Sequence, residues 1–137
     1  MPSFPFTSAL VTGASSGIGA EMARQLGRAG VPTVLVARRG DKLREIAEQF
    51  DGFSVLEADL GTAAGQDAVM EAVGNTEDPI DLVVNNAGFG TSGQFAELDA
   101  DRLGDEVELN VKALTRISNA AARAMAARGS GYLLNVS

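Results

Sequence analysis

Short, continuous apolar runs alternate with longer segments of helical periodicity along this chain. The runs cover residues 9–11, 33–36, 53–56, 82–84 and 133–136. Continuous hydrophobicity, rather than strict alternation, is typical of strands that are covered on both faces of a parallel sheet. Strands that alternate with helices favour an open α/β architecture. We therefore predict five buried parallel strands connected by helices.

Four segments of helical periodicity separate these runs. Each of the first two ends at a glycine, Gly30 or Gly52, which favours helix termination, and Asp41 is placed to cap the second. A third, weaker pattern covers about residues 64–73, and the longest runs from Asp99 or Asp101 to about residue 127. The apolar positions that we expect the helices to bury are Ile18, Met22, Leu26 and Ala29 in the first, Leu43, Ile46 and Phe50 in the second, and Leu103, Val107, Val111, Leu114, Ala121 and Met125 in the fourth.

The composition narrows the classes of function. The chain has 137 residues, of which 45% are hydrophobic and 21% charged, as in one ordinary globular domain. The net charge of −7 argues against nucleic acid and anionic membranes as broad electrostatic partners, but it permits a local site for one phosphate. Neither cysteine nor histidine occurs, which excludes disulfides, histidine-based triads and thiolate or imidazole metal sites, so we predict no metal. With no signal peptide and no apolar span of about 18 residues, we predict a cytoplasmic protein.

A glycine-rich turn lies between the first strand and the first helix. Gly13 permits a tight turn, Gly17 allows the backbone to approach a pyrophosphate, and Gly19 allows the helix to pack on the sheet. The helix N-terminus then offers free N–H groups and a positive dipole end to phosphates. The spacing is G-x-x-x-G-x-G, not the commoner G-x-G-x-x-G, and glycines alone leave a simple strand-to-helix turn as an alternative.

Three further features accompany this turn. Asp59-Leu60 follows the third strand, Asn85-Asn86-Ala87-Gly88 follows the fourth, and Asn110 lies within the longest helix. Together with residues 12–19, TGASSGIG, they resemble the short-chain dehydrogenase/reductase family in order and separation, over essentially the whole chain. The resemblance implies a Rossmann-type, doubly wound parallel sheet with strand order 3-2-1-4-5. It also implies an NAD(P)-binding domain over residues 1–137.

The resemblance assigns roles to individual residues. Asn110 matches the asparagine that supports a water molecule in the family's proton relay. A helix-face asparagine bonded to a neighbouring carbonyl or to solvent is the alternative for Asn110, and a helix cap is the alternative for Asp59. The cofactor-binding residues that the resemblance implies are Gly13, Ser15, Ser16, Gly17, Ile18, Gly19, Asp59, Leu60, Asn86, Ala87 and Gly88.

The end of the second strand indicates which dinucleotide binds. NAD sites place a carboxylate about 20 residues past the glycines, where it bonds the ribose hydroxyls. Here that position is Ala37, and Arg38-Arg39 follow with no acid before Asp41. A guanidinium suits the 2′-phosphate of NADP, so we expect NADP as the cofactor and Arg38 as the main phosphate ligand. A solvated arginine pair is the alternative.

The family's reaction also needs a serine and a Tyr-x-x-x-Lys pair. Tyr132 is the only tyrosine, and the residue four positions later is Val136. Ser137 is more consistent with the neighbour of the catalytic serine than with that serine itself. The resemblance therefore implies a cofactor-binding half, truncated after the fifth strand, in which the Rossmann domain is incomplete and inactive on its own.

Two functions stay open from the sequence. One is an NADP-dependent oxidoreductase that transfers hydride between nicotinamide and an alcohol or ketone, with this chain as its amino-terminal part. The other is a module that holds NADP(H) without turnover. A binder of S-adenosylmethionine or another nucleotide is disfavoured, because it does not explain residues 85–88 together with Asn110. The family implies a homo-oligomer formed through the long helix, and we expect neither nucleic acid nor membrane as a partner.

Overall fold

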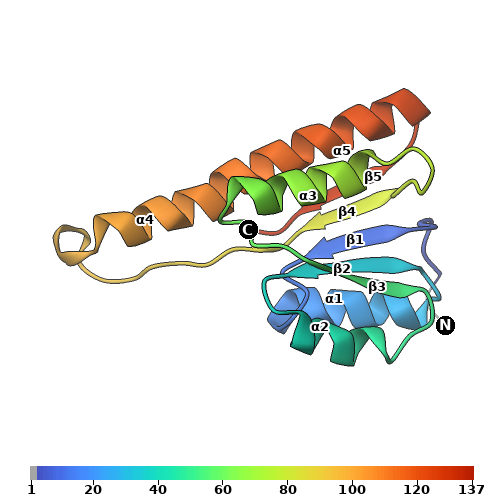
Figure 1. The fold of residues 1–137 in the computed structure, drawn as a ribbon, viewed down its shortest axis with the longest axis horizontal. Helices are drawn as coiled ribbons and strands as arrows, with labels where there is room; N and C mark the ends of the chain where they lie inside the picture. Colours follow the sequence, from blue (N-terminus) through green and yellow to red (C-terminus); the bar gives the residue numbers. More distant parts are fainter. Residues whose placement is uncertain (1–2) are drawn as a thin grey trace.

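A five-stranded parallel sheet forms the centre of the molecule (Figure 1). The computed structural model describes residues 3–137. The strands are β1 (Ala9–Thr12), β2 (Thr33–Ala37), β3 (Phe53–Glu57), β4 (Leu82–Asn85) and β5 (Tyr132–Asn135). Their order is β3-β2-β1-β4-β5, and every neighbouring pair is parallel. The predicted order 3-2-1-4-5 and the doubly wound class are confirmed.

Helices cover both faces of this sheet. The first face carries α1 (Gly17–Arg28) and α2 (Gly40–Ala47), and the opposite face carries α3 (Ala63–Gly74) and the long helix (Figure 1). The long helix is built from α4 (Ala100–Val107), a π-helical turn η2 (Glu108–Ala113) and α5 (Leu114–Arg128), and a short 3₁₀ turn η1 (Phe95–Glu97) precedes it. Within residues 3–137, none of the helices combines the length and apolar character that crossing a membrane requires.

The strands bury alternate residues in two separate cores. Ala9 and Val11 of β1 pack with α1 and α2, whereas Leu10 between them packs with α3 and α5. Successive side chains of a strand point to opposite faces, so a strand between two helical layers must be apolar throughout. This is why the runs read as continuous hydrophobicity in the sequence.

Three details of the first helical layer differ from the prediction. Asp41 does not cap α2; the N-cap is Arg39, the helix begins at Gly40, and Asp41 lies in the first turn. Phe50 follows the helix instead of belonging to it, and its ring fills the space left by Gly27 of α1. Ile18 is 60% exposed because α1 buries its small residues against the sheet instead.

The long helix buries only part of the predicted face: Ala121 and Met125 are buried as predicted, but the predicted positions before them are not. Val107 and Val111 are 58% and 55% exposed, and α4 has no buried residue. Figure 1 shows the cause, since α4 extends beyond the carboxyl ends of the strands. In addition, a π turn contains an extra residue, so apolar positions before it no longer line up with those after it. The buried face is made by Ala113, Ile117, Ala121 and Met125.

The prediction that the fifth strand is buried is also wrong. Tyr132, Leu133 and Leu134 are 48%, 39% and 43% exposed. Among residues 3–137, β5 is an edge strand that pairs only with β4. A continuous apolar run indicates the potential for burial, but the number of neighbouring elements decides how much of the strand is covered.

Asp81 joins three segments at the amino ends of the strands. Its carboxylate accepts hydrogen bonds from the backbone N–H groups of Thr7 and Ser8 at 2.9 and 3.0 Å, and from the Thr7 hydroxyl at 2.8 Å. Its backbone carbonyl accepts from Tyr132 at 2.7 Å. Partial burial acts to raise the pKa of Asp81, but the hydrogen bonds from Ser8 and Thr7 outweigh it and hold the pKa below its ordinary value.

We expect Asp81→Asn to lower the free energy of unfolding by about 1 kcal/mol at neutral pH, because an amide nitrogen cannot accept these bonds. The folded pKa lies below the unfolded value of about 3.9, so this contribution is complete above that value and is lost as the pH falls through the folded pKa. Urea unfolding at neutral and strongly acid pH measures it. A difference between wild type and variant that stays constant with pH would contradict this assignment.

Candidate functional site

A cleft of about 720 Å³ opens where the carboxyl ends of β1, β2 and β4 meet. The chain connections reverse direction between β1 and β4, and ligands of open parallel sheets bind at such a switch point. Gly17 and Gly19 lie in the first turn of α1, directly after Ser16, and are not among the residues that line the cleft. The other predicted cofactor-binding residues all line the cleft: Gly13, Ser15, Ser16, Ile18, Arg38, Asp59, Leu60, Asn86, Ala87 and Gly88.

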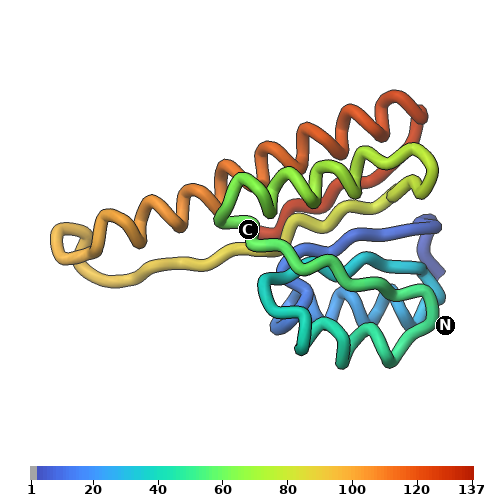
Figure 2. Tube along the Cα trace, in the orientation of Figure 1, coloured from blue at the N-terminus to red at the C-terminus, as the bar shows by residue number. Residues whose placement is uncertain are grey.

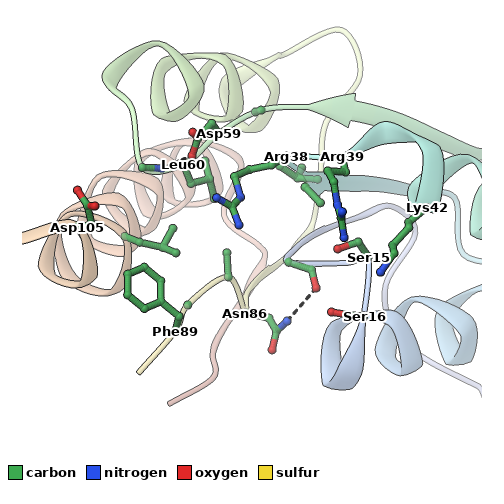
Figure 3. A pocket seen from close by; sticks show the side chains of 18 of the residues that line it. Ser15, Ser16, Arg38, Arg39, Lys42, Asp59, Leu60, Asn86, Phe89 and Asp105 are labelled. Carbon is green, nitrogen blue, oxygen red and sulfur yellow. Dashed lines mark hydrogen bonds between the residues drawn. The ribbon is translucent and has the colours of Figure 1, made fainter. Parts of the chain in front are cut away.

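The floor of the cleft is held by the Thr12 side chain. Its hydroxyl oxygen accepts hydrogen bonds from the backbone N–H groups of Asn86 and Ala87 at 2.9 and 3.0 Å. The Asn86 amide donates to the carbonyl of Gly13 at 3.2 Å (Figure 3). Gly13 has φ +61°, and a Cβ there would lie 2.9 Å from Cα of Ala87. The ends of β1 and β4 therefore approach more closely than any residue other than glycine permits.

Asn85 has a structural part in the same motif. Its buried side-chain amide donates to the Ser118 hydroxyl of α5 at 3.1 Å and to the Asn135 side chain of β5 at 3.0 Å. Asn85 therefore ties the end of β4 to α5 and to the end of β5.

The other two glycines of the turn play different parts. Gly19 is buried, and a Cβ there would overlap the Gly13 carbonyl and the Asn86 amide, so it serves helix packing. Gly17 has φ +58°, and no atom lies within 4 Å of where its Cβ would be, so this backbone is open to a ligand. Ser16 is the N-cap of α1, but its hydroxyl makes no capping hydrogen bond. The first turn of α1 is therefore not capped by its own N-cap side chain.

Three cationic side chains line a second side of the cleft. Arg38 and Arg39 form the turn after β2, and Lys42 lies in the first turn of α2. In Figure 3, Arg39 and Lys42 point toward Ser15, whereas Arg38 points toward the middle of the cleft beside Leu60. Sequence reasoning did not include Lys42. The sequence could have indicated Lys42, because it lies three residues after Arg39 at the start of a helix, and side chains with this spacing are neighbours.

Asp59 and Leu60 form the third side. The Asp59 carboxylate accepts from the N–H of Gly61 at 2.9 Å, while Thr62 caps α3 by accepting from Gly65. The helix-cap alternative for Asp59 is therefore wrong, and its carboxylate instead holds the turn that begins α3. Gln66, which is fully buried, donates to the carbonyl of Leu60 at 3.0 Å and so fixes that backbone.

Gln66 also connects α3 to the long helix. Its amide donates to Glu108 at 3.1 Å, and Arg116 donates to its oxygen at 2.8 Å. Hydrogen bonding from Lys112, together with Gln66, lowers the pKa of Glu108. These polar contacts lock the wall that carries Leu60 against the helix that carries Asn110.

Asn110 lies within the π turn and is bonded to the segment that follows β4. Its Oδ1 accepts from the N–H of Phe89 at 3.1 Å, and its Nδ2 donates to the carbonyl of Phe89 at 2.7 Å. Figure 2 shows this segment running beside α4. A neighbouring backbone group therefore satisfies Asn110, as one alternative from the sequence had it. Its part in a proton relay stays a prediction.

The long helix supplies a fourth side that the sequence analysis missed. Arg102, Asp105 and Leu109 line the cleft together with Phe89. The Arg102 guanidinium lies 4.2 Å from the centre of the Phe89 ring, a cation–π contact. Arg102, Asp105 and Leu109 are spaced three and four residues apart, which places them on one face of the helix just before Asn110. This spacing was the signal in the sequence that could have indicated their position.

Removing the Thr12 hydroxyl is expected to destabilise the floor of the cleft. In Thr12→Val the backbone N–H groups of Asn86 and Ala87 lose their acceptor, so the free energy of unfolding should fall by about 2 kcal/mol. Thr12→Ser keeps the hydroxyl and is the matched control. Chemical denaturation of both variants measures the difference, and a Val variant as stable as the Ser variant would contradict this role.

Comparison with known proteins identifies relatives over almost the whole chain. The family model described as short chain dehydrogenase matches residues 7–137. An uncharacterized oxidoreductase of Staphylococcus epidermidis is 33% identical over 129 residues, which are 93% of this chain and 56% of that protein. The chain therefore spans about half the length of the relatives that it matches.

Solved structures agree with this comparison. A short-chain dehydrogenase from Sphingobium yanoikuyae in complex with NADPH is 35% identical with a TM-score of 0.88, over 93% of this chain and 52% of that chain. A bulky-bulky ketone specific alcohol dehydrogenase from Comamonas testosteroni is 34% identical with a TM-score of 0.88, over 94% and 53% respectively.

Proposed function

Because this chain belongs to the short-chain dehydrogenase family, we propose that it is the cofactor-binding half of an NADP-dependent oxidoreductase that interconverts an alcohol and a ketone. One observation carries the proposal: Ser15 and Ser16, directly before the open backbone of Gly17, line the same cleft as Arg38, Arg39 and Lys42. When bound, the nicotinamide ring would accept or supply the hydride. The family relation and the relative in complex with NADPH support the choice of cofactor.

The turn before α1 fits a diphosphate. Gly17 leaves open space above its backbone, and the Ser16 hydroxyl is not used for capping α1. The N–H groups of the first helical turn and the positive end of the helix dipole favour an anion at this place. Ser15 and Ser16 line the cleft beside it, where their hydroxyls would donate to phosphate oxygens.

The turn after β2 fits an additional phosphate on the adenosine ribose. Arg38, Arg39 and Lys42 bring three positive charges to one rim of a chain whose net charge is −7. No carboxylate ends β2, so nothing there suits the free ribose hydroxyls of NAD. We propose Arg38 as the main ligand of the 2′-phosphate, with Arg39 and Lys42 adding to the local charge.

Arg38→Ala should weaken NADPH binding about tenfold or more and leave NADH binding nearly unchanged, because the lost contact is to the 2′-phosphate alone. Titration calorimetry with both nucleotides measures the ratio. Arg123→Ala, which removes a cation of α5 that does not line the cleft, is the matched control. Equal affinity of wild type for NADH and NADPH, or an unchanged ratio in the Arg38 variant, would contradict the proposal.

We propose that Asn110 takes part in the proton relay of the whole enzyme. Its Oδ1 keeps a second lone pair beyond the bond from Phe89, and this pair is the acceptor that a relay water would need. The two bonds with Phe89 hold the amide plane in one orientation. The tyrosine, lysine and serine of the reaction would come from residues other than those of this chain.

The 137 residues alone should bind NADPH without oxidising it. Tyr132 is the only tyrosine, it begins β5, and Val136 stands where a catalytic lysine would have to be. Loss of NADPH absorbance in the presence of assorted ketones tests this, with binding measured in the same sample. NADPH oxidation above the rate in buffer would contradict the proposal that these 137 residues bind the cofactor but do not catalyse the reaction. Binding without turnover also matches the alternative of a non-catalytic NADP(H)-binding module.

We also propose that the long helix is the contact surface of a homo-oligomer. Val107 and Val111 are more than half exposed and lie one turn apart on this helix. Light scattering should show a mass above that of one chain, and Val111→Glu should reduce it because a charge is costly in an apolar contact. A wild-type monomer at high concentration would contradict the proposal. The cytoplasmic location stays a prediction.

A further inference from the structure

Two of the cations that line the cleft, Arg38 and Arg39, are carried by a very short connection. β2 ends at Ala37 and α2 begins at Gly40, so Arg38 and Arg39 alone join them. Arg39 is also the N-cap of α2, and its side chain makes no capping bond to the helix. Both arginine side chains are exposed, so contacts of their own do not determine where the connection lies. Its position therefore depends on how its two ends are held.

Both ends are held by the end of β3. Glu57, the last residue of β3, is paired in register with Ala37, and the N–H of Ala58 donates to the Ala37 carbonyl at 3.1 Å. From the same place the Glu57 carboxylate reaches across the connection, where Oε1 accepts from the N–H of Gly40 at 2.6 Å. Glu57 thus supplies the N-terminal cap that the Arg39 side chain does not, and a carboxylate there is favoured by the helix dipole.

Gly40 shows how closely the carboxylate is fitted. Gly40 is buried, and a Cβ at this position would overlap the Glu57 side chain. Its backbone is not in the positive-φ region, so the conformation alone does not call for glycine. The absence of a side chain is needed for the Glu57 contact. Arg44 adds an ion pair to Glu57 at 3.8 Å, but both side chains are more than half exposed, so that pair contributes little.

We propose that Glu57 is a positioning residue that holds Arg38, Arg39 and the start of α2 in the arrangement that recognises a 2′-phosphate. The inference rests on the proposed function. Glu57 does not itself line the cleft and acts through the connection that it closes. Because Glu57 already accepts the hydrogen bond from the N–H of Gly40, this N–H is not free to donate to a phosphate. The phosphate would therefore be bound by the cationic side chains.

Binding of 2′,5′-ADP and 5′-AMP to the 137-residue chain, measured by calorimetry, tests the inference because these probes differ only in the 2′-phosphate. Glu57→Ala should weaken 2′,5′-ADP binding about fivefold to tenfold and change 5′-AMP binding less than twofold. Glu57→Gln keeps an oxygen acceptor and should restore most of the affinity. Gly40→Ala, which displaces the carboxylate by a different route, should resemble Glu57→Ala. Arg44→Ala keeps the cap and should resemble wild type.

The outcomes separate the two proposals. If wild type does not prefer 2′,5′-ADP, the proposed cofactor is wrong. If wild type prefers it and Glu57→Ala keeps the preference while remaining folded by circular dichroism, the positioning role is wrong. Tighter binding of 2′,5′-ADP by both Glu57→Ala and Glu57→Gln would also overturn it, because the carboxylate would then act only by repelling phosphate. A loss of affinity equal for both probes would show general damage to the fold and overturn it as well.

Discussion

The hydrogen bonds of the Thr12 hydroxyl hold the ends of β1 and β4 together, and the cleft exists because of that contact. Gly13, Asn86 and Ala87 meet there with no room for a further methyl group. The backbone groups at the ends of parallel strands have no partners within the sheet. At the switch point between β1 and β4, the connections that follow the two strands also lead away from each other. One side chain that satisfies two backbone N–H groups turns this gap into a rigid floor.

Around the floor, each wall is held by a polar contact from outside the cleft. Gln66 fixes the backbone of Leu60, Asn110 fixes that of Phe89, and Glu57 closes the connection that carries the arginines. These supporting groups bond mainly to backbone atoms, so they determine positions without taking up the space of a ligand. Such an arrangement suits a site whose ligand is large and has several phosphates, because most of its contacts need fixed N–H groups and cations.

Most residues that line the cleft were predictable because their positions depend on local sequence. These residues are glycines at a strand-to-helix turn, small residues after one strand and arginines after another. Each lies directly at the end of a strand, so the sequence pattern of that strand is enough to place it. Lys42, Arg102 and Asp105 were not predicted, because they reach the cleft through the directions of helices. Only the later part of the buried face of the long helix, at Ala121 and Met125, was assigned correctly, because the π turn shifts the positions before it and nothing in the apolar pattern reports such a turn.

The sequence by itself determined the five strands and the glycine-rich turn at residues 12–19, because hydrophobic periodicity and the placement of glycines depend on a few neighbouring residues. The order of the strands followed from the family resemblance. Tertiary structure alone decided which side of each helix is buried, how exposed β5 is, and that Glu57 caps α2 in place of Asp41. The physical reason is distance along the chain. Glu57 and Gly40 are 17 residues apart, and only the pairing of β2 with β3 brings the carboxylate to the helix N–H.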